Sequence, residues 1–257
     1  MKRACGRPQA GREDGQRGGG AVEHPTHPTH LLVFDLDGTV LDGHGAGHRA
    51  MERAFLQVVG QPGEFNHLDF AGRTDPAMLH LAADRLGITI ADEQWPRLLD
   101  AFVTALAETA GATRALPGVS TLLRRLAQNP DVGLAVGTGN VEAGAAIKLK
   151  AVGLADVFPV GGYGSDGESR EAMLAVAVAR TRRFYHADDA PLVTVGDTPR
   201  DVAAAHALGL RCIAVATGRY AQPDLEAAGA DAALPSLEDA AGFYRVVSRL
   251  SGRDLSD

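Results

Sequence analysis

The chain has 257 residues, which is enough for one large domain or two modest ones. Apolar residues make up 45% of it and charged residues 22%, the composition of a soluble globular protein that can bury a core. The 32 acidic side chains outnumber the 25 basic ones, for a formal charge of −7. This acidic balance argues against a nucleic acid or an anionic membrane as a partner. No apolar run approaches the roughly 18 to 20 residues of a membrane span, and the N-terminus lacks the apolar stretch of a secretory signal.

The chain contains two cysteines, Cys5 and Cys212. They are too few for a disulfide framework and match no metal-ligand spacing. A reducing compartment fits this usage, so we expect a cytoplasmic protein.

The first 29 residues have the composition of a disordered extension. They contain six Gly and three Pro and almost no Leu, Ile or Phe, so they bury too little apolar area to offset the entropy of ordering. His24, His27 and His30 are spaced three apart and could converge on a metal. Because each X-Pro step between them favours an extended chain, we prefer a solvated linker.

Short apolar runs recur from residue 31 onward and predict buried parallel strands. The clear runs are 31–35, 132–136, 191–195 and 211–216, with weaker candidates at 157–160 and 231–234. Helical periodicity separates them, for example over 119–126 and 171–185. Strands that alternate with helices indicate an α/β fold with a doubly wound, Rossmann-like parallel sheet.

About a hundred residues separate the first strand from the second, whereas a βαβ unit needs only ~30. The spacing predicts three helices there, over 46–60, 75–87 and 91–110. Asp75 and Asp92 are assigned as N-caps, and Gly60, Gly87 and Gly111 as stops. We therefore expect an all-helical insert over 43–113 in a core formed by 30–42 and 114–257. Gly and Pro residues near 42–46 and 111–117 predict hinges at its two ends.

Polar residues follow three of the predicted strands. Asp35 and Asp37 follow the first, Thr138 to Asn140 the second, and Asp197 and Asp201 another. The carboxyl ends of parallel strands meet at one edge of the sheet, where ligands bind. Two carboxylates two residues apart lie on one side of an extended backbone and repel each other unless a proton or a cation neutralises them. Mg²⁺, which prefers carboxylate oxygens, suits such a cluster, whereas helix capping explains only one aspartate at a time.

The first of these segments, Phe34-Asp35-Leu-Asp37-Gly-Thr39, resembles the first signature of the haloacid dehalogenase superfamily, in its phosphatase branch. Val136-Gly-Thr138-Gly-Asn140 resembles the second motif of that superfamily and Val195-Gly-Asp197-Thr-Pro-Arg-Asp201 the fourth. The resemblance covers roughly residues 31 to 220. The helical insert resembles the helical cap domain of the superfamily, and phosphoglycolate phosphatases are the nearest resemblance.

This resemblance implies a role for each motif residue. Asp35 would be the nucleophile that forms an aspartyl phosphate, and Asp37 the general acid and base. Thr138, with the backbone N–H groups near Gly139 and Asn140, would hold phosphoryl oxygens, and Thr39 belongs to the same substrate-binding set. Mg²⁺ would be bound by Asp35, Asp197 and the main-chain carbonyl of Asp37, with Asp201 as a further carboxylate.

The sequence departs from the superfamily at the third motif, which usually places a lysine shortly before the fourth strand. No lysine follows Lys150. The active-site cation would then be Lys148, which we prefer, or Lys150 or Arg170. The alternative is that Lys148 and Lys150 are ordinary surface residues of a helix.

Substrate choice is expected to reside in the cap. Arg73 stands in a turn that leads into a helix, where it could bind a substrate carboxylate or the phosphate, or lie in a solvated loop. His44 and His48 follow the first motif and could line the entrance, although surface positions are the simpler reading.

The sequence thus predicts a Mg²⁺-dependent phosphomonoester hydrolase acting on a small phosphorylated metabolite, with phosphoglycolate-like substrates as the nearest resemblance, as a monomer or homodimer. A sugar-phosphate mutase of the same superfamily shares the aspartyl-phosphate chemistry and stays open. A receiver-like phosphorylation switch also combines acidic residues, Mg²⁺, Thr and Lys on a parallel sheet. Paired aspartates on one strand and a large insert disfavour the switch, which needs neither a proton donor nor a lid.

Overall fold

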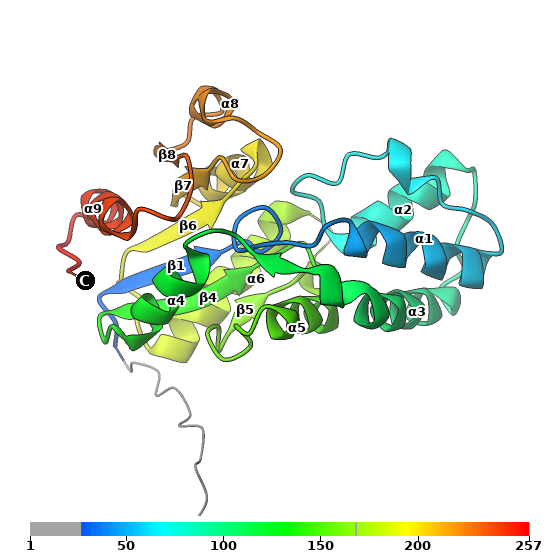
Figure 1. The fold of residues 1–257 in the computed structure, drawn as a ribbon, viewed down its shortest axis with the longest axis horizontal. Helices are drawn as coiled ribbons and strands as arrows, with labels where there is room; N and C mark the ends of the chain where they lie inside the picture. Colours follow the sequence, from blue (N-terminus) through cyan, green and yellow to red (C-terminus); the bar gives the residue numbers. More distant parts are fainter. Residues whose placement is uncertain (1–26, 168, 257) are drawn as a thin grey trace, which may run out of the picture.

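The structure is a computed structural model and describes residues 27–167 and 169–256. Its centre is a six-stranded parallel sheet in the order β5-β4-β1-β6-β7-β8 (Figure 1). The strands are β1 (His30–Phe34), β4 (Val132–Gly137), β5 (Gly161–Gly162), β6 (Leu192–Gly196), β7 (Arg211–Val215) and β8 (Ala232–Leu234). The chain leaves β1 toward β4 on one side and later returns to β6 on the other. The two central connections therefore diverge at the carboxyl end of β1.

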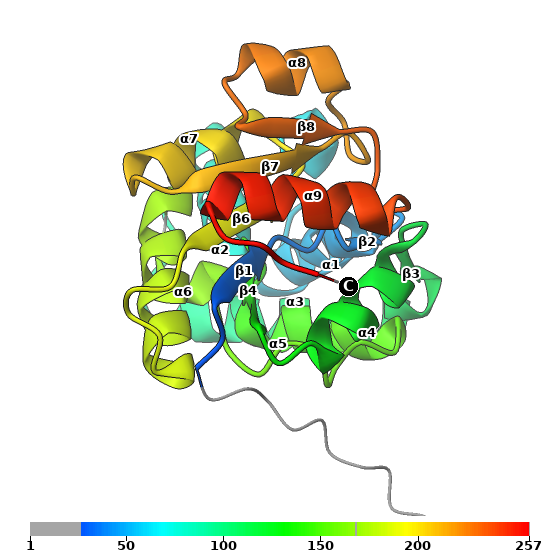
Figure 2. The same ribbon diagram turned by 90° about the vertical axis from the view of Figure 1, so that its left-hand side faces the viewer.

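Helices cover both faces of this sheet (Figure 2). One face packs against α4 (Val119–Gln128), α5 (Glu142–Ala151) and α9 (Ala240–Ser251). The other packs against α6 (Arg170–Tyr185), α7 (Pro199–Ala207) and α8 (Gln222–Ala227). Along β1, Leu32 and Phe34 enter the first layer whereas Leu31 and Val33 enter the second. This alternation confirms the predicted doubly wound sheet with both faces buried.

The helical insert lies beside the core and has its own apolar centre (Figure 1). Its helices are α1 (Ala46–Val59), α2 (Asp75–Arg85) and α3 (Gln94–Thr109), with 3₁₀ turns η1 (Phe65–His67) and η2 (Ala110–Ala112). The buried aromatic rings of Phe55, Phe65 and Phe102 belong to this centre. We call the insert the cap; the predicted bounds 43–113 stay a prediction.

The two chain crossings between core and cap pair with each other. Strands β2 (Leu41–Asp42) and β3 (Arg114–Ala115) form an antiparallel ribbon, with Leu41 opposite Ala115 and Asp42 opposite Arg114. The crossings therefore form one connection of two strands, at the place where the sequence predicts hinges.

Several local predictions are wrong. The weak strand expected at 157–160 is not one, because Val157 and Phe158 turn into the core and only Gly161 and Gly162 pair with β4. Asp75 does not cap α2, since the Thr74 hydroxyl accepts from the Ala77 N–H. Asp92 does not cap α3, which begins at Gln94 behind Glu93 without a side-chain cap. Gly111 lies inside η2 instead of stopping α3.

The predicted extension 1–29 lies almost wholly outside the described residues, together with His24 and Cys5. His30, by contrast, is buried at the start of β1, and its ring contacts Ser251 Oγ at 3.1 Å. Cys212 is buried in β7, and burial raises the pKa of its thiol to about 12. Within the described part of the chain, no helix is long and apolar enough to cross a membrane.

Candidate active site

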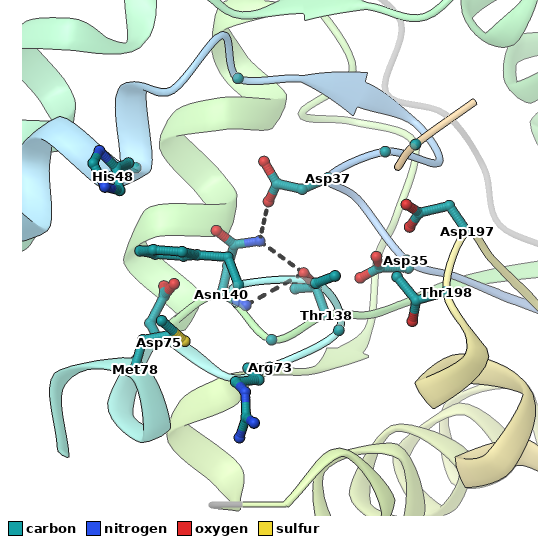
Figure 3. A pocket seen from close by; sticks show the side chains of 18 of the residues that line it. Asp35, Asp37, His48, Arg73, Asp75, Met78, Thr138, Asn140, Asp197 and Thr198 are labelled. Atoms are coloured by element: carbon teal, nitrogen blue, oxygen red, sulfur yellow. Dashed lines mark hydrogen bonds between the residues drawn. The ribbon is translucent and has the colours of Figure 1, made fainter. Parts of the chain in front are cut away.

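A cavity of about 460 Å³ opens between the carboxyl edge of the sheet and the cap (Figure 3). The core contributes residues that follow β1, β4 and β6, and the cap contributes residues of α1, α2 and the loop before α2. Its wall includes these predicted site residues: Asp35, Asp37, Thr138, Gly139, Asn140, Lys148, Arg73 and Asp197. The topology thus brings together motifs as distant in the sequence as Asp35 and Asp197.

The turn after β1 is shaped for close contact with Asp197. Gly38 has φ +85°, and a Cβ atom on it would lie 2.3 Å from Asp197 Oδ2. The Thr217 hydroxyl donates to the Gly38 carbonyl at 2.6 Å. A residue with a side chain is therefore excluded at position 38 both by backbone conformation and by space.

Three buried carboxylates meet below this turn. Asp35, Asp197 and Asp201 each offer an oxygen, and these oxygens lie within 4.8 Å of one another. Burial raises the pKa of Asp35 to about 6, against the opposing charge of Arg170. Burial, together with repulsion from Asp201 and Asp35, raises the pKa of Asp197 to about 9. The cluster therefore resists carrying its full negative charge.

The residues fit a hard divalent cation. All the donors are carboxylate oxygens, which Mg²⁺ prefers, and they are buried together, with the Arg170 guanidinium paired to Asp35 and Asp201. A cation would relieve the repulsion that raises the pKa of Asp197. One oxygen of Asp201 already has hydrogen-bond partners, because its Oδ2 accepts from the Thr198 N–H and hydroxyl at the start of α7.

Arg170 pairs with two members of this cluster. Its Nη2 lies 2.8 Å from Asp35 Oδ1 and also donates to Asp201 Oδ1. Although burial alone would lower its pKa, the charges of Asp201 and Asp35 raise the pKa of the guanidinium. A cation in the first turn of α6 opposes the helix dipole, so its acidic partners are what stabilise it there.

Lys148 occupies a second position, on Asp37. Its Nζ donates to the two oxygens of Asp37 at 2.8 and 2.6 Å and to Asn140 Oδ1 at 2.6 Å. Burial lowers the pKa of the ammonium, but Asp37 and Asp75 outweigh this and raise it. Of the three cations that the sequence offered as alternatives, Lys148 and Arg170 therefore lie in the site, on different aspartates. The third, Lys150, is exposed on α5.

The loop after β4 is tied to Asp37. Asn140 Nδ2 donates to Asp37 Oδ2 at 2.6 Å and to the Thr138 hydroxyl at 2.8 Å (Figure 3). Gly139 has no room for a side chain, since a Cβ atom would lie 2.2 Å from the carbonyl oxygen of Arg73. The cap backbone thus lies directly against this loop.

The remaining predicted residues are not members of the carboxylate cluster, although Thr39 contacts it. Thr39 is fully buried, does not line the cavity, and its hydroxyl donates to Asp197 Oδ1 at 3.4 Å. Arg73 is exposed at the cavity wall, and Figure 3 shows its side chain turned away from Asp35 and Asp37. His48 lines the cavity and packs edge-on to Phe70, with ring centres 5.3 Å apart.

The sequence interpretation missed the contacts that dock the cap on the core. Asp69 of the cap accepts from Arg200 at 3.0 Å and from Arg219 at 3.0 Å. Asp75 accepts from the Val141 N–H at 2.9 Å and lines the cavity. Burial raises the pKa of Asp75 to about 7 against the opposing charge of Lys148. The predicted helix 75–87 does begin at Asp75, but Thr74 caps it, which leaves the Asp75 carboxylate for another partner.

Fold and site together define an α/β protein of the doubly wound class, with an acidic centre suited to a cation and a helical cap above it. The sequence matches the haloacid dehalogenase-like hydrolase family over residues 32–215. The chain belongs to this family, which confirms the resemblance of its motifs. The comparison with curated proteins gives no match.

Solved structures with the same fold match this chain over nearly their whole length. A hydrolase from Pseudomonas syringae is 24% identical, with a TM-score of 0.62 over 82% of this chain and 96% of that one. A predicted phosphatase from Clostridium acetobutylicum is 18% identical, with a TM-score of 0.65 over 85% and 99%. A predicted phosphoglycolate phosphatase from Haemophilus somnus is 18% identical, with a TM-score of 0.63 over 83% and 96%. These likenesses establish the fold.

Proposed function

We propose that this chain is a Mg²⁺-dependent phosphomonoester hydrolase that works through an aspartyl-phosphate intermediate on a small phosphorylated metabolite. The observation that carries the proposal is the meeting of Asp35, Asp197 and Asp201 at the sheet edge, with Arg170 on Asp35. The phosphatase names of structural neighbours support the same class of reaction. A cytoplasmic location and a monomeric or homodimeric state belong to the same proposal.

In the first step, a carboxylate oxygen of Asp35 attacks the phosphorus and the bond from phosphorus to the leaving oxygen breaks. Asp37, as the general acid, gives a proton to that oxygen, so the alcohol leaves neutral. Asp37 suits this role because its side chain is 43% exposed toward the cavity, whereas Asp35 is buried below it.

In the second step, Asp37, now a carboxylate, takes a proton from a water whose oxygen attacks the phosphorus. The bond between Asp35 and phosphorus breaks, inorganic phosphate leaves, and the Asp35 carboxylate is restored. Two successive displacements divide a very slow hydrolysis into two easier steps.

We assign different roles to the two cations. Arg170, on the nucleophile Asp35, neutralises charge on the phosphoryl group as it is transferred. Lys148 and Asn140 hold the carboxyl group of Asp37 in place for both proton transfers. The Thr138 hydroxyl and the N–H groups near Gly139 and Asn140 bind the phosphoryl oxygens.

The metal would be held by Asp35, Asp197 and the main-chain carbonyl of Asp37, with Asp201 as a further carboxylate around it. When bound, Mg²⁺ supplies positive charge beside the phosphoryl oxygens. The protein residues bind and orient the ester, and the docked cap excludes bulk water from the phosphorus.

The direct test is a screen of phosphorylated metabolites with the full chain and Mg²⁺. Sustained release of inorganic phosphate from at least one small phosphomonoester is the expected result. An isomerised sugar phosphate without phosphate release would identify a mutase. A single stoichiometric phosphorylation without turnover would identify a phosphorylation switch, and either outcome would overturn the proposal.

Arg73 is expected to select substrates that carry a carboxylate. Arg73→Ala should lower kcat/KM by on the order of 10 to 150-fold for a carboxylated phosphate ester, because a lost charged hydrogen-bond pair is worth ~1.5 to 3 kcal/mol. The loss for a small aryl phosphate should be slight. Steady-state kinetics on phosphoglycolate and an aryl phosphate give the comparison.

Arg85→Ala is the matched control, because Arg85 is an exposed arginine at the other end of α2. It should leave both substrates unaffected. Equal losses on both substrates with Arg73→Ala would instead place Arg73 at the phosphate or in the scaffold.

A further inference from the structure

Helix α5 begins with a residue that cannot cap it. Its N-cap is Val141, in an extended backbone conformation (φ −63°, ψ 149°), and no side chain of its own sequence accepts a hydrogen bond there. Valine is among the poorest N-cap residues because it carries no acceptor. The helix start therefore needs an acceptor from elsewhere for its unpaired N–H groups.

The cap supplies that acceptor. Oδ2 of Asp75 accepts from the Val141 N–H at 2.9 Å, and the Asp75 N–H donates to the Gly139 carbonyl at 2.7 Å. Figure 3 shows Asp75 on the same side of the cavity as Asn140. Because Thr74 caps α2, the Asp75 carboxylate is available for α5. A carboxylate at a helix N-terminus also interacts favourably with the helix dipole.

These two hydrogen bonds lie on either side of Asn140, at the end of the loop 138–140, which we assign to phosphate binding. It is clamped on both sides: a Cβ atom on Gly139 would lie 2.2 Å from Arg73 O, and one on Gly164 would lie 2.1 Å from Gly139 O. Asn140 stands in this loop and Lys148 on α5, and both donate hydrogen bonds to Asp37. The loop geometry therefore depends on where the cap places Asp75.

We propose that Asp75 is a positioning residue by which the docked cap supplies a side-chain acceptor at the start of α5, for the N–H of its N-cap residue Val141, and so shapes the phosphate-binding loop. This inference rests on the proposed function, since it takes loop 138–140 as the phosphoryl site. The phosphoryl group is common to all substrates. Its affinity for the site therefore depends on a cap residue that does not need to contact the leaving group.

The test compares Asp75→Ala with Asp75→Asn and with a control, Asp84→Ala, an exposed carboxylate at the far end of α2. Binding of orthophosphate and orthovanadate is measured by ligand-induced thermal shift and by inhibition, and KM on two esters with different leaving groups. Asp75→Ala should weaken orthophosphate binding by about 5- to 30-fold, the factor that one helix cap corresponds to. KM should rise by a similar factor on both esters. Asp75→Asn, whose amide oxygen still accepts from Val141, should stay close to the wild type, as should Asp84→Ala.

A rescue separates capping from other roles of Asp75. In Val141→Thr the new side chain has nearly the same shape, and its hydroxyl can accept from the N–H three residues on, at Gly144. In the Asp75→Ala background, Val141→Thr should recover part of the lost orthophosphate affinity, because it caps α5 at the Gly144 N–H while the N–H of residue 141 still lacks the Asp75 acceptor. A thermal unfolding curve for each variant reports whether it is folded.

Three outcomes would overturn the inference. They are unchanged orthophosphate binding in Asp75→Ala, a loss confined to one leaving group, and no recovery by Val141→Thr. The second would mean that Asp75 contacts the substrate directly. If the wild type bound orthophosphate but hydrolysed no ester, the proposed function would fail while the binding comparison still tested Asp75.

Discussion

Asp35→Asn should reduce phosphate release to background, a loss on the order of 10⁴-fold or more. The amide has the shape of the carboxylate but cannot form an aspartyl phosphate. The fold should persist, because Arg170 keeps its pairing with Asp201 and because the change removes a buried carboxyl group whose pKa burial raises to about 6. Steady-state phosphate release measures the first effect and thermal unfolding the second.

Asp37→Asn is the informative companion. Asp35 stays intact in it, so an aryl phosphate, whose leaving group needs little protonation, should still phosphorylate the enzyme. Hydrolysis of the intermediate should slow, because no carboxylate takes the proton from water. Phosphoenzyme trapped after acid quench should therefore accumulate in Asp37→Asn and be missing in Asp35→Asn. Substantial turnover by Asp35→Asn would contradict the covalent mechanism.

Removal of the divalent cation should have an effect of comparable size. Excess chelator should abolish turnover, and Mg²⁺ should restore it better than Ca²⁺, whose longer bonds and looser coordination misplace the reacting groups. Asp197→Ala should raise the Mg²⁺ concentration required or eliminate activity. Full activity in excess chelator would contradict the assignment of a metal.

The same site predicts a pH-dependent stability that needs no substrate. In the metal-free protein the pKa values of Asp35 and Asp197 are raised to about 6 and about 9, so the folded state binds these protons more tightly than the unfolded state. Their contribution to stability is therefore present at low pH and is lost as the pH rises from about 4 to about 9. Mg²⁺ should raise the Tm more at pH 8 than at pH 5, because protons compete with it at the lower pH. In Asp197→Ala this pH-dependent gain should shrink, and an undiminished gain would place the ion elsewhere.

The sequence by itself determined the sheet and the place of the acidic centre. The strands β1, β4, β6 and β7 are continuous apolar runs, because both faces of a parallel sheet are buried, and such runs can be recognised locally. The ends of parallel strands must meet at one edge. That rule was enough to expect Asp35, Asp37, Thr138 and Asp197 at a common cavity.

Sequence reasoning was weaker where the outcome depended on a partner far along the chain. Asp75 lies beside Thr74 and reads as a helix cap, yet its acceptor oxygen serves Val141 of another helix. The segment 157–160 is apolar because it packs on the core. In the sequence, such a buried segment has the same apolar pattern as a buried strand.

Only the tertiary structure decided how the charges are divided. Lys148 and Arg170 were competing candidates for one cation position, and the fold gives each its own aspartate, Asp37 and Asp35. The docking of the cap through Asp69 and Asp75 was likewise unseen in the sequence. Periodicity reports whether a residue is buried or exposed, which depends on its own segment. The partner of a buried charge lies on another segment, which comes close only when the chain folds. Leaving a buried charge unpaired costs free energy, and this cost selects the partner.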